Sequence, residues 1–189
     1  IINMNREEFF ALIASMEENN EGYGENWFDK NEIIQFLEEN KSDKEVFQAS
    51  IKFHPEILGF ADEKITDDTE LMTYAVAEWG RDALIFASDR IKSDNIIVID
   101  AIKYKLEFFS HVLDVVSERL RNDIEIVALA KKCCYDTHTF EELQLASTEI
   151  RSNKDFILEQ LEYFTKEFCN PTDAGYRWGP VFLKYISDA

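Results

Sequence analysis

The sequence contains few of the residues that break helices. Of its 189 residues, 6 are glycine and 3 are proline. Proline is absent from residues 56–170, and glycine is absent from residues 81–174. Sandwiches and barrels need turn-forming residues about every ten positions, because each short strand ends in a turn. The composition therefore excludes a strand-rich fold over most of the chain and favours helices.

Basic residues are also scarce, since 20 Lys and Arg stand against 38 Asp and Glu, a formal net charge of −18. Direct binding to nucleic acid depends on neutralising phosphates with basic side chains, so we do not expect it. Docking on an anionic membrane surface is unexpected for the same reason. No apolar stretch approaches the roughly 18 residues of a membrane span.

Cysteine is rare as well, with three residues in the chain. Cys133 and Cys134 are adjacent, which is a poor geometry for a disulfide within a helix. The segment Ile1–Glu8 lacks the basic-then-apolar order of a signal peptide. These features predict a cytoplasmic protein with reduced thiols.

Helix-start signals recur along the chain. In a capping box, a Ser, Thr, Asp or Asn is followed three residues later by an acid, and the two side chains bond each other's backbone N–H groups. His54-Pro55-Glu56 is a further start, because proline suits the first helical position. The capping pairs are Asn5/Glu8, Asp29/Glu32, Ser42/Glu45, Asp67/Glu70, Asn122/Glu125, Thr139/Glu142 and Ser152/Asp155.

Apolar residues recur at helical spacing between these starts, as in Leu71, Met72, Ala75 and Val76. The resulting amphipathic helices have about three turns and are too short to be stable alone. They must pack on one another. The sequence therefore predicts an all-α fold.

The starts in the middle of the chain are regularly spaced. Ser42, Asp67, Ser93 and Asn122 are 25, 26 and 29 residues apart. Each interval is long enough for two short helices and a tight turn, and a single helix pair cannot bury both of its faces. We expect a short right-handed stack of helix pairs, an α-solenoid-like array with units of about 25–29 residues.

The end of each interval also repeats in sequence. It begins with Leu, continues with small or branched residues and an acid-base-aliphatic triplet, and finishes with an Asp that starts the next helix. The three copies are 58–68, 84–94 and 113–123. We expect the charged pairs of the triplets to form exposed ladders between neighbouring units, each pair worth about 0–1 kcal/mol. These pairs are Glu63/Lys64, Asp89/Arg90 and Glu118/Arg119.

The Asp-x-Glu-hydrophobic starts and the Leu-x-x-Ala-Ser-x-x-Leu-Arg-x-Asp ends resemble bacterial tandem helical repeats classed as a domain of unknown function. The resemblance covers about residues 42–135. It departs from the family pattern at Ile96, where the acidic capping partner is missing, and at Asp62, where Ser is expected. It implies a helical-repeat fold and no particular activity. Within a single domain, residues 1–41 and 136–189 are expected to be helical end caps, the second with an aromatic tail.

The chain offers little recognisable chemistry. Cys133, Cys134 and His138 are close in sequence, but a zinc site needs two separated pairs of ligands. No glycine-rich phosphate loop is present. We therefore expect neither a metal nor a cofactor. Cys134 and His138 have the four-residue spacing of one helix face, which keeps a small cysteine-dependent hydrolase as an alternative.

Residues 1–42 are the most acidic part of the chain, with 10 acids and 3 bases. Solubility is the simpler explanation, and the functional one is attraction of a basic partner. The candidate contact residues are Glu17, Glu18, Glu21, Glu25 and Asp29. The favoured function is a non-enzymatic module that binds another protein. The first alternative is an acidic inhibitor or decoy in the basic site of a nucleic-acid enzyme.

Overall fold

The computed structural model describes residues 4–19, 31–104, 111–133 and 141–168. All regular elements in these ranges are helices and none is a strand, which confirms the all-α prediction. No helix in these ranges has both the length and the apolar composition that crossing a bilayer requires. In chain order the helices are α1 (Arg6–Asn19), α2 (Asn31–Glu39), α3 (Lys44–Ser50), η1 (Pro55–Phe60), α4 (Glu63–Thr66), α5 (Thr69–Trp79), α6 (Arg81–Leu84), η2 (Ile91–Ser93), α7 (Asn95–Lys103), η3 (Val112–Asp114), α8 (Glu118–Arg121), α9 (Ile124–Cys133), α10 (Glu141–Leu145), α11 (Thr148–Ser152) and α12 (Lys154–Phe168).

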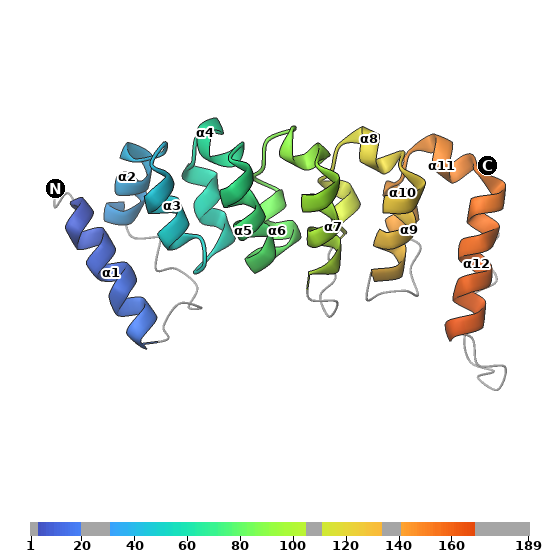
Figure 1. Ribbon diagram of the computed structural model, residues 1–189, viewed down its shortest axis with the longest axis horizontal. Coiled ribbons are helices and arrows are strands. Elements are labelled where there is room, and N and C mark those ends of the chain that lie inside the picture. The colour runs from blue at the N-terminus through green and yellow to red at the C-terminus, as the bar shows by residue number, and fades with distance from the viewer. Residues whose placement is uncertain (1–3, 20–30, 105–110, 134–140, 169–189) are drawn as a thin grey trace.

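The helices follow one another in chain order along an elongated row, with α1 at one end and α12 at the other (Figure 1). The longer helices α5, α7 and α9 lie side by side, and the short elements α6, η3 and α10 pack against them. The one-turn helices α4, α8 and α11 lie along one border of the row, which we call the upper edge (Figure 1). Consecutive elements are therefore neighbours in space, as short connections require.

Aspartates start the longer helices, one residue later than the capping boxes predict. Asp43, Asp68 and Asp94 are the N-caps of α3, α5 and α7, and Asp123 accepts the N–H groups that begin α9. In α3, α5 and α9 an acid lies in the first helical turn, where its charge suits the helix dipole. The N–H groups of Asp43, Asp68 and Asp123 bond backbone carbonyls, so these acids do not complete a capping box. The predicted caps at Ser42, Asp67 and Asn122 are therefore wrong by one residue. Likewise, Asn153 and not Ser152 bonds the N–H of Phe156 at the start of α12.

Two other helix starts are as predicted. Asn5 and Glu8 form a reciprocal capping box, with N–H to side-chain oxygen distances of 2.8 and 3.0 Å. His54 caps η1 by accepting the N–H of Glu56, and Pro55 occupies the first position. The predicted starts at Asp29 and Thr139 lie outside the described residues.

The core runs along the row and uses equivalent positions of successive units. Leu58, Leu84 and Leu113, which open the three sequence copies, are all at most 1% exposed. The aliphatic residues of the charged triplets are buried as well: Ile65, Ile91 and Leu120. Burial of each such side chain is worth about 1.5–3 kcal/mol. The repeated sequence positions are therefore core positions.

Each interval contains one more helix than the two predicted. The extra element is a single turn on the upper edge: α4, η2 or α8. Side chains before the triplet cap two of these turns: Asp62 accepts the N–H of Lys64, and Ser88 accepts the N–H of Ile91. A further turn of this kind, α11, follows Leu143 and Ala146, which are buried like their counterparts. The same arrangement therefore continues beyond residue 135.

Candidate functional site

The upper edge is crossed four times by the same backbone hydrogen bond. In each case a residue that precedes a one-turn helix donates its N–H to the carbonyl two residues before the Asp that caps an earlier helix. This donor directly precedes α4, α8 and α11, and it lies three residues before η2. We number these contacts junctions 1 to 4. They are Asp62 N to Lys41 O (3.0 Å), Ser88 N to Thr66 O (3.0 Å), Ser117 N to Lys92 O (3.1 Å) and Ser147 N to Arg121 O (2.9 Å).

A side-chain pair accompanies the backbone bond. At junction 1, Ser42 donates its hydroxyl to the Asp62 carboxylate. At junction 2 the residue types are exchanged, so that Ser88 donates to Asp67. Asp62 stands where the repeat pattern expects Ser, and Ser42 supplies the hydroxyl donor in its place. Each junction therefore still has one donor and one acceptor. At junction 4, Ser147 donates to the Asn122 side chain.

Junction 3 lacks this side-chain bond because both positions are serine. Ser93 donates its hydroxyl to Asp89 O within its own turn. The Ser117 hydroxyl is buried and has no hydrogen-bond partner in the described part of the chain. Junction 3 therefore lacks the serine-based side-chain bond that the other three junctions have.

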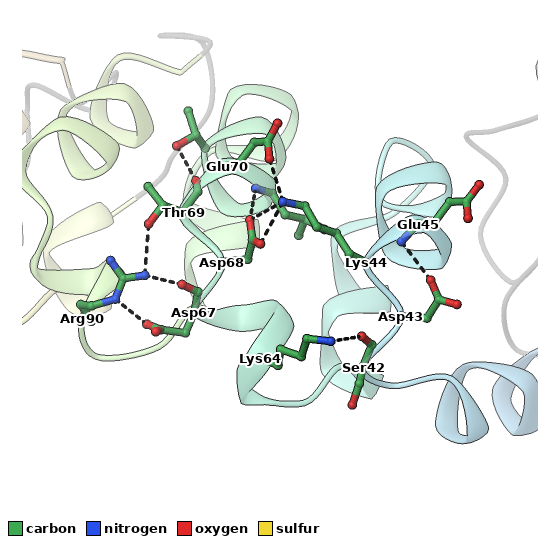
Figure 2. A network of polar contacts seen from close by, with 12 residues as sticks. Ser42, Asp43, Lys44, Glu45, Lys64, Asp67, Asp68, Thr69, Glu70 and Arg90 are labelled. Atoms are coloured by element: carbon green, nitrogen blue, oxygen red, sulfur yellow. Dashed lines mark hydrogen bonds and ion pairs between the residues drawn. The ribbon is translucent and has the colours of Figure 1, made fainter.

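The basic residue of each charged triplet bonds the backbone of the preceding unit. Lys64 donates to Ser42 O at 3.4 Å, and Arg90 donates to Asp67 O (Figure 2). Arg119 donates to Ser93 O in the same way. These carbonyls precede the capping aspartates. The predicted contacts between successive triplet pairs are not found in the described chain. Lys64 and Arg119 bond backbone carbonyls, and Arg90 bonds both the carbonyl and the carboxylate of Asp67. The acids of the triplets, Glu63, Asp89 and Glu118, are exposed.

At junction 4 the polarity of this contact is reversed. Glu149 occupies the place of Arg119, and it accepts a hydrogen bond of 2.9 Å from the Asn122 side chain. An acid replaces the base there because the preceding unit offers an amide donor. The contact between units is preserved although its charge is not.

The capping aspartates also form ion pairs across units. Lys44 lies 2.9 Å from the Asp68 carboxylate and 2.7 Å from that of Glu70 (Figure 2). The N–H of Leu71, followed by Lys44, holds the pKa of Asp68 below its ordinary value. The hydrogen bonds from Ser88 and then Arg90 lower the pKa of Asp67 in the same way.

Asp43 forms a similar contact with the first helix. Burial alone would raise the pKa of its carboxyl group, but the bonds from Arg6 and from the N–H groups of Val46 and Glu45 leave it lowered. Arg6 also pairs with Glu45. Most charges of the upper edge are thus used to join neighbouring elements, and they are not gathered around a single reacting position.

The predicted acidic site is described only in part. Glu18 is exposed near the end of α1, and Glu17 belongs to the same helix. Glu21, Glu25 and Asp29 lie outside the described residues. The described part of the structure therefore does not bring these five residues together.

The predicted cysteine chemistry finds no activated thiol in the described residues. Cys133, at the end of α9, is half-buried, and this burial raises the pKa of its thiol despite the opposing charges of Lys132 and Lys103. Cys134 and His138 lie outside the described residues. No group of three metal-ligating side chains occurs within the ranges that the structure covers.

One apolar residue stands out on the upper edge. Ile96 is 72% exposed, at the position two residues after the capping Asp where the other units have Glu45, Glu70 and Glu125. The sequence marked this residue as a departure from the repeat pattern, and the exposure shows that no core contact requires it.

Comparison with protein-family models, with curated proteins and with solved structures finds no match for this chain.

Proposed function

We propose that the chain is a non-enzymatic, bacterial-type helical-repeat module that binds another protein in the cytoplasm. Its units form a right-handed α-solenoid-like stack. Successive units begin at Asp43, Asp68, Asp94, Asp123 and Asn153, which are 25, 26, 29 and 30 residues apart. The observation that carries the proposal is the recurrence of one backbone contact at four junctions. Units joined in the same way build a continuous surface, and such surfaces are suited to extended partners.

The distribution of polar groups supports binding over catalysis. Catalysis needs a nucleophile, a base and a stabilising group within hydrogen-bond reach of one reacting atom. On the described upper edge, the charged groups pair along the length of the row, as Lys44 does with Asp68 and Arg90 with Asp67. An extended surface is left for contact with a partner.

Affinity capture with the full chain tests this proposal at two salt concentrations. We expect a protein partner to be retained from a bacterial lysate at both about 0.1 M and about 1 M NaCl, because apolar contacts persist when the Debye length falls from about 10 to about 3 Å. The partner is then purified and its affinity measured directly. The proposal is contradicted if no partner is captured at both salt concentrations.

The variant Ile96→Glu shows whether the upper edge contributes. Glutamate occupies the same position in three other units, so the substitution fits the fold. Loss of a purified partner's affinity in this variant, with an unchanged circular dichroism spectrum, places the contact on α7. Glu125→Gln is the matched control, since it also alters an exposed residue at this position of another unit.

A second candidate is an acidic inhibitor or decoy for a nucleic-acid enzyme. The observation that favours it is the net charge of −18, which attracts a basic site over a long range. Its partner would be captured at low salt and released at high salt, because salt screens that attraction. A basic nucleic-acid enzyme lost between the two conditions therefore favours the decoy over the module.

A further inference from the structure

The upper edge contains a pocket at junction 4. Its volume is about 710 Å³, and it is lined by α8, the end of α10 and α11. Pockets that hold small ligands have volumes of about 300–1,000 Å³. The size of this pocket therefore suits a small molecule or the side chains of a short peptide.

The pocket is basic although the chain is acidic. Arg119, Arg121 and Arg151 line it, against the two acids Glu118 and Glu149. Glu149 is already bonded by Asn122, another lining residue. The formal charge of the lining is thus +1, whereas the whole chain carries −18.

Arg121 has unused hydrogen-bonding capacity. Its Nε atom is buried and has no hydrogen-bond partner in the described part of the chain. The other arginines in the described ranges all donate hydrogen bonds: Arg6, Arg81, Arg90, Arg119 and Arg151. A buried donor without an acceptor is unfavourable. Because Nε has almost no accessible surface, a ligand in the pocket would meet the other N–H groups of the guanidinium, which make no hydrogen bond within the described chain.

The basic pocket at junction 1 differs in this respect. It has a volume of about 530 Å³, and Lys41, Lys44 and Lys64 line it. Lys44 is bonded to Asp68 and Glu70, and Lys64 donates to Ser42 O. Two of its cations are thus engaged by the protein, and the third, Lys41, is exposed to solvent, whereas Arg121 is half-buried.

We propose that the pocket at junction 4 binds a carboxylate through the Arg121 guanidinium, with Arg119 and Arg151 completing its basic lining. Guanidinium groups pair bidentately with carboxylates and with phosphates. A lining charge of +1 matches a single carboxylate, and the chain's negative field opposes a polyanion such as a nucleic acid. The carboxylate belongs either to a small organic acid or to an acidic residue of a peptide. This inference does not depend on the proposed protein-binding function.

Titration followed by NMR tests the site on the full chain at constant ionic strength. The probes are succinate, the blocked amino acid N-acetyl-glutamate amide, and inorganic phosphate. The readout is the Nε–H resonance of Arg121, with that of Arg81, which already donates to Asp114 at 3.0 Å, as internal control. We expect a saturable shift at Arg121 with at least one carboxylate probe and no such shift at Arg81.

Two variants separate the pocket from general charge effects. Arg121→Gln is expected to weaken carboxylate binding about tenfold or more, because a charge-assisted bidentate contact is lost. Arg6→Gln removes one positive charge at the other end of the row and is expected to leave the affinity unchanged. Circular dichroism confirms that both variants are folded.

The outcomes distinguish the source of the carboxylate. Saturation by succinate indicates a small organic acid, and saturation by the glutamate amide alone indicates a peptide side chain. Either result supports the proposal when Arg121→Gln also weakens the affinity for that carboxylate probe. Saturation by phosphate alone, equal weakening by both variants, or no saturable shift with any probe overturns it. None of these results bears on capture of a protein partner.

Discussion

Ser88 donates its hydroxyl to the Asp67 carboxylate at junction 2, and the pair at junction 1 makes the same contact in the opposite direction. There Ser42 is the donor and Asp62 the acceptor. Each pair has one donor and one acceptor, so either order satisfies both groups. The two positions are thus coupled, and a change at one is tolerated when the other changes with it.

Exchange of the junction 1 residues tests this coupling. Asp62→Ser alone leaves two serines, as at junction 3, and we expect it to lower the free energy of unfolding. Adding Ser42→Asp recreates the order of junction 2 and is expected to restore stability. Urea unfolding of the single and double variants is expected to give a coupling energy of about 0.5–1.5 kcal/mol. Strictly additive effects would show that the two side chains act independently.

Two serines at equivalent positions are expected to differ in importance. Ser88 bonds Asp67 and also accepts the N–H of Ile91 at 3.3 Å, so Ser88→Ala removes a cap worth about 1 kcal/mol. The Ser117 hydroxyl has neither contact in the described chain. Ser117→Ala is therefore expected to change the unfolding free energy by less than about 0.5 kcal/mol. Urea midpoints measured side by side check the pair, and equal losses argue against the difference between the junctions.

The sequence predicted the all-α class because apolar residues that recur at helical spacing are the ones that become buried. Leu58, Leu84 and Leu113 recur in phase and are all buried. The repeated sequence ends predicted the starts at Asp68, Asp94 and Asp123 correctly. The capping-box spacing placed starts one residue too early because two cap-forming residues are adjacent, as in Ser42-Asp43, and the acid spacing favoured the first. The structure uses the second, which frees the first for a contact with the next unit.

The contacts of the charged triplets were mispredicted for a different reason. Side-chain patterns contain no information on backbone carbonyls, and Arg90 and Arg119 bond carbonyls two or more helices away in the chain. One signal for contact between units was available in the sequence. Serine and aspartate exchange positions between the pairs Ser42/Asp62 and Asp67/Ser88, as expected of residues that bond each other. The pocket at Arg121 had no such signal, because it depends on which arginine lacks an acceptor.

The capping carboxylate of α5 is expected to make stability pH-dependent. Its pKa is lower in the folded state than the ordinary value of 3.8, so the unfolded chain binds its proton first as the pH falls. The stabilisation is complete above the unfolded value and is lost as the pH falls through the folded one. Asp68→Asn keeps the cap but removes the charge, and it is therefore expected to be less stable than the native chain at pH 7.

The difference between the native chain and Asp68→Asn is expected to vanish at low pH. Urea unfolding at several pH values below 5 measures it. Asp89→Asn is the control, because it removes one exposed carboxylate that is not used as an acceptor in the described chain. Asp68→Ala removes the cap as well and is expected to be about 1 kcal/mol less stable than Asp68→Asn at every pH. If the unfolding free energies of the native chain and of Asp68→Asn differed by the same amount at every pH, the lowered pKa of Asp68 would not contribute to stability.

Gly80 connects α5 to α6 with a φ of +56°, and Tyr104 at the end of α7 packs directly on it. A Cβ at this position would lie 2.5 Å from Tyr104 Cδ1. Gly80→Ala therefore combines a strained backbone with a steric clash, and we expect a loss of about 2–4 kcal/mol. Gly59→Ala is the matched control, because its Cβ would lie 3.3 Å from the edge of the Phe86 ring, and its cost is expected to stay below about 1 kcal/mol. Thermal unfolding of the two variants makes the comparison. Similar losses would mean that Tyr104 moves aside at little cost, so that its contact with Gly80 does not fix the position of α7 against α5.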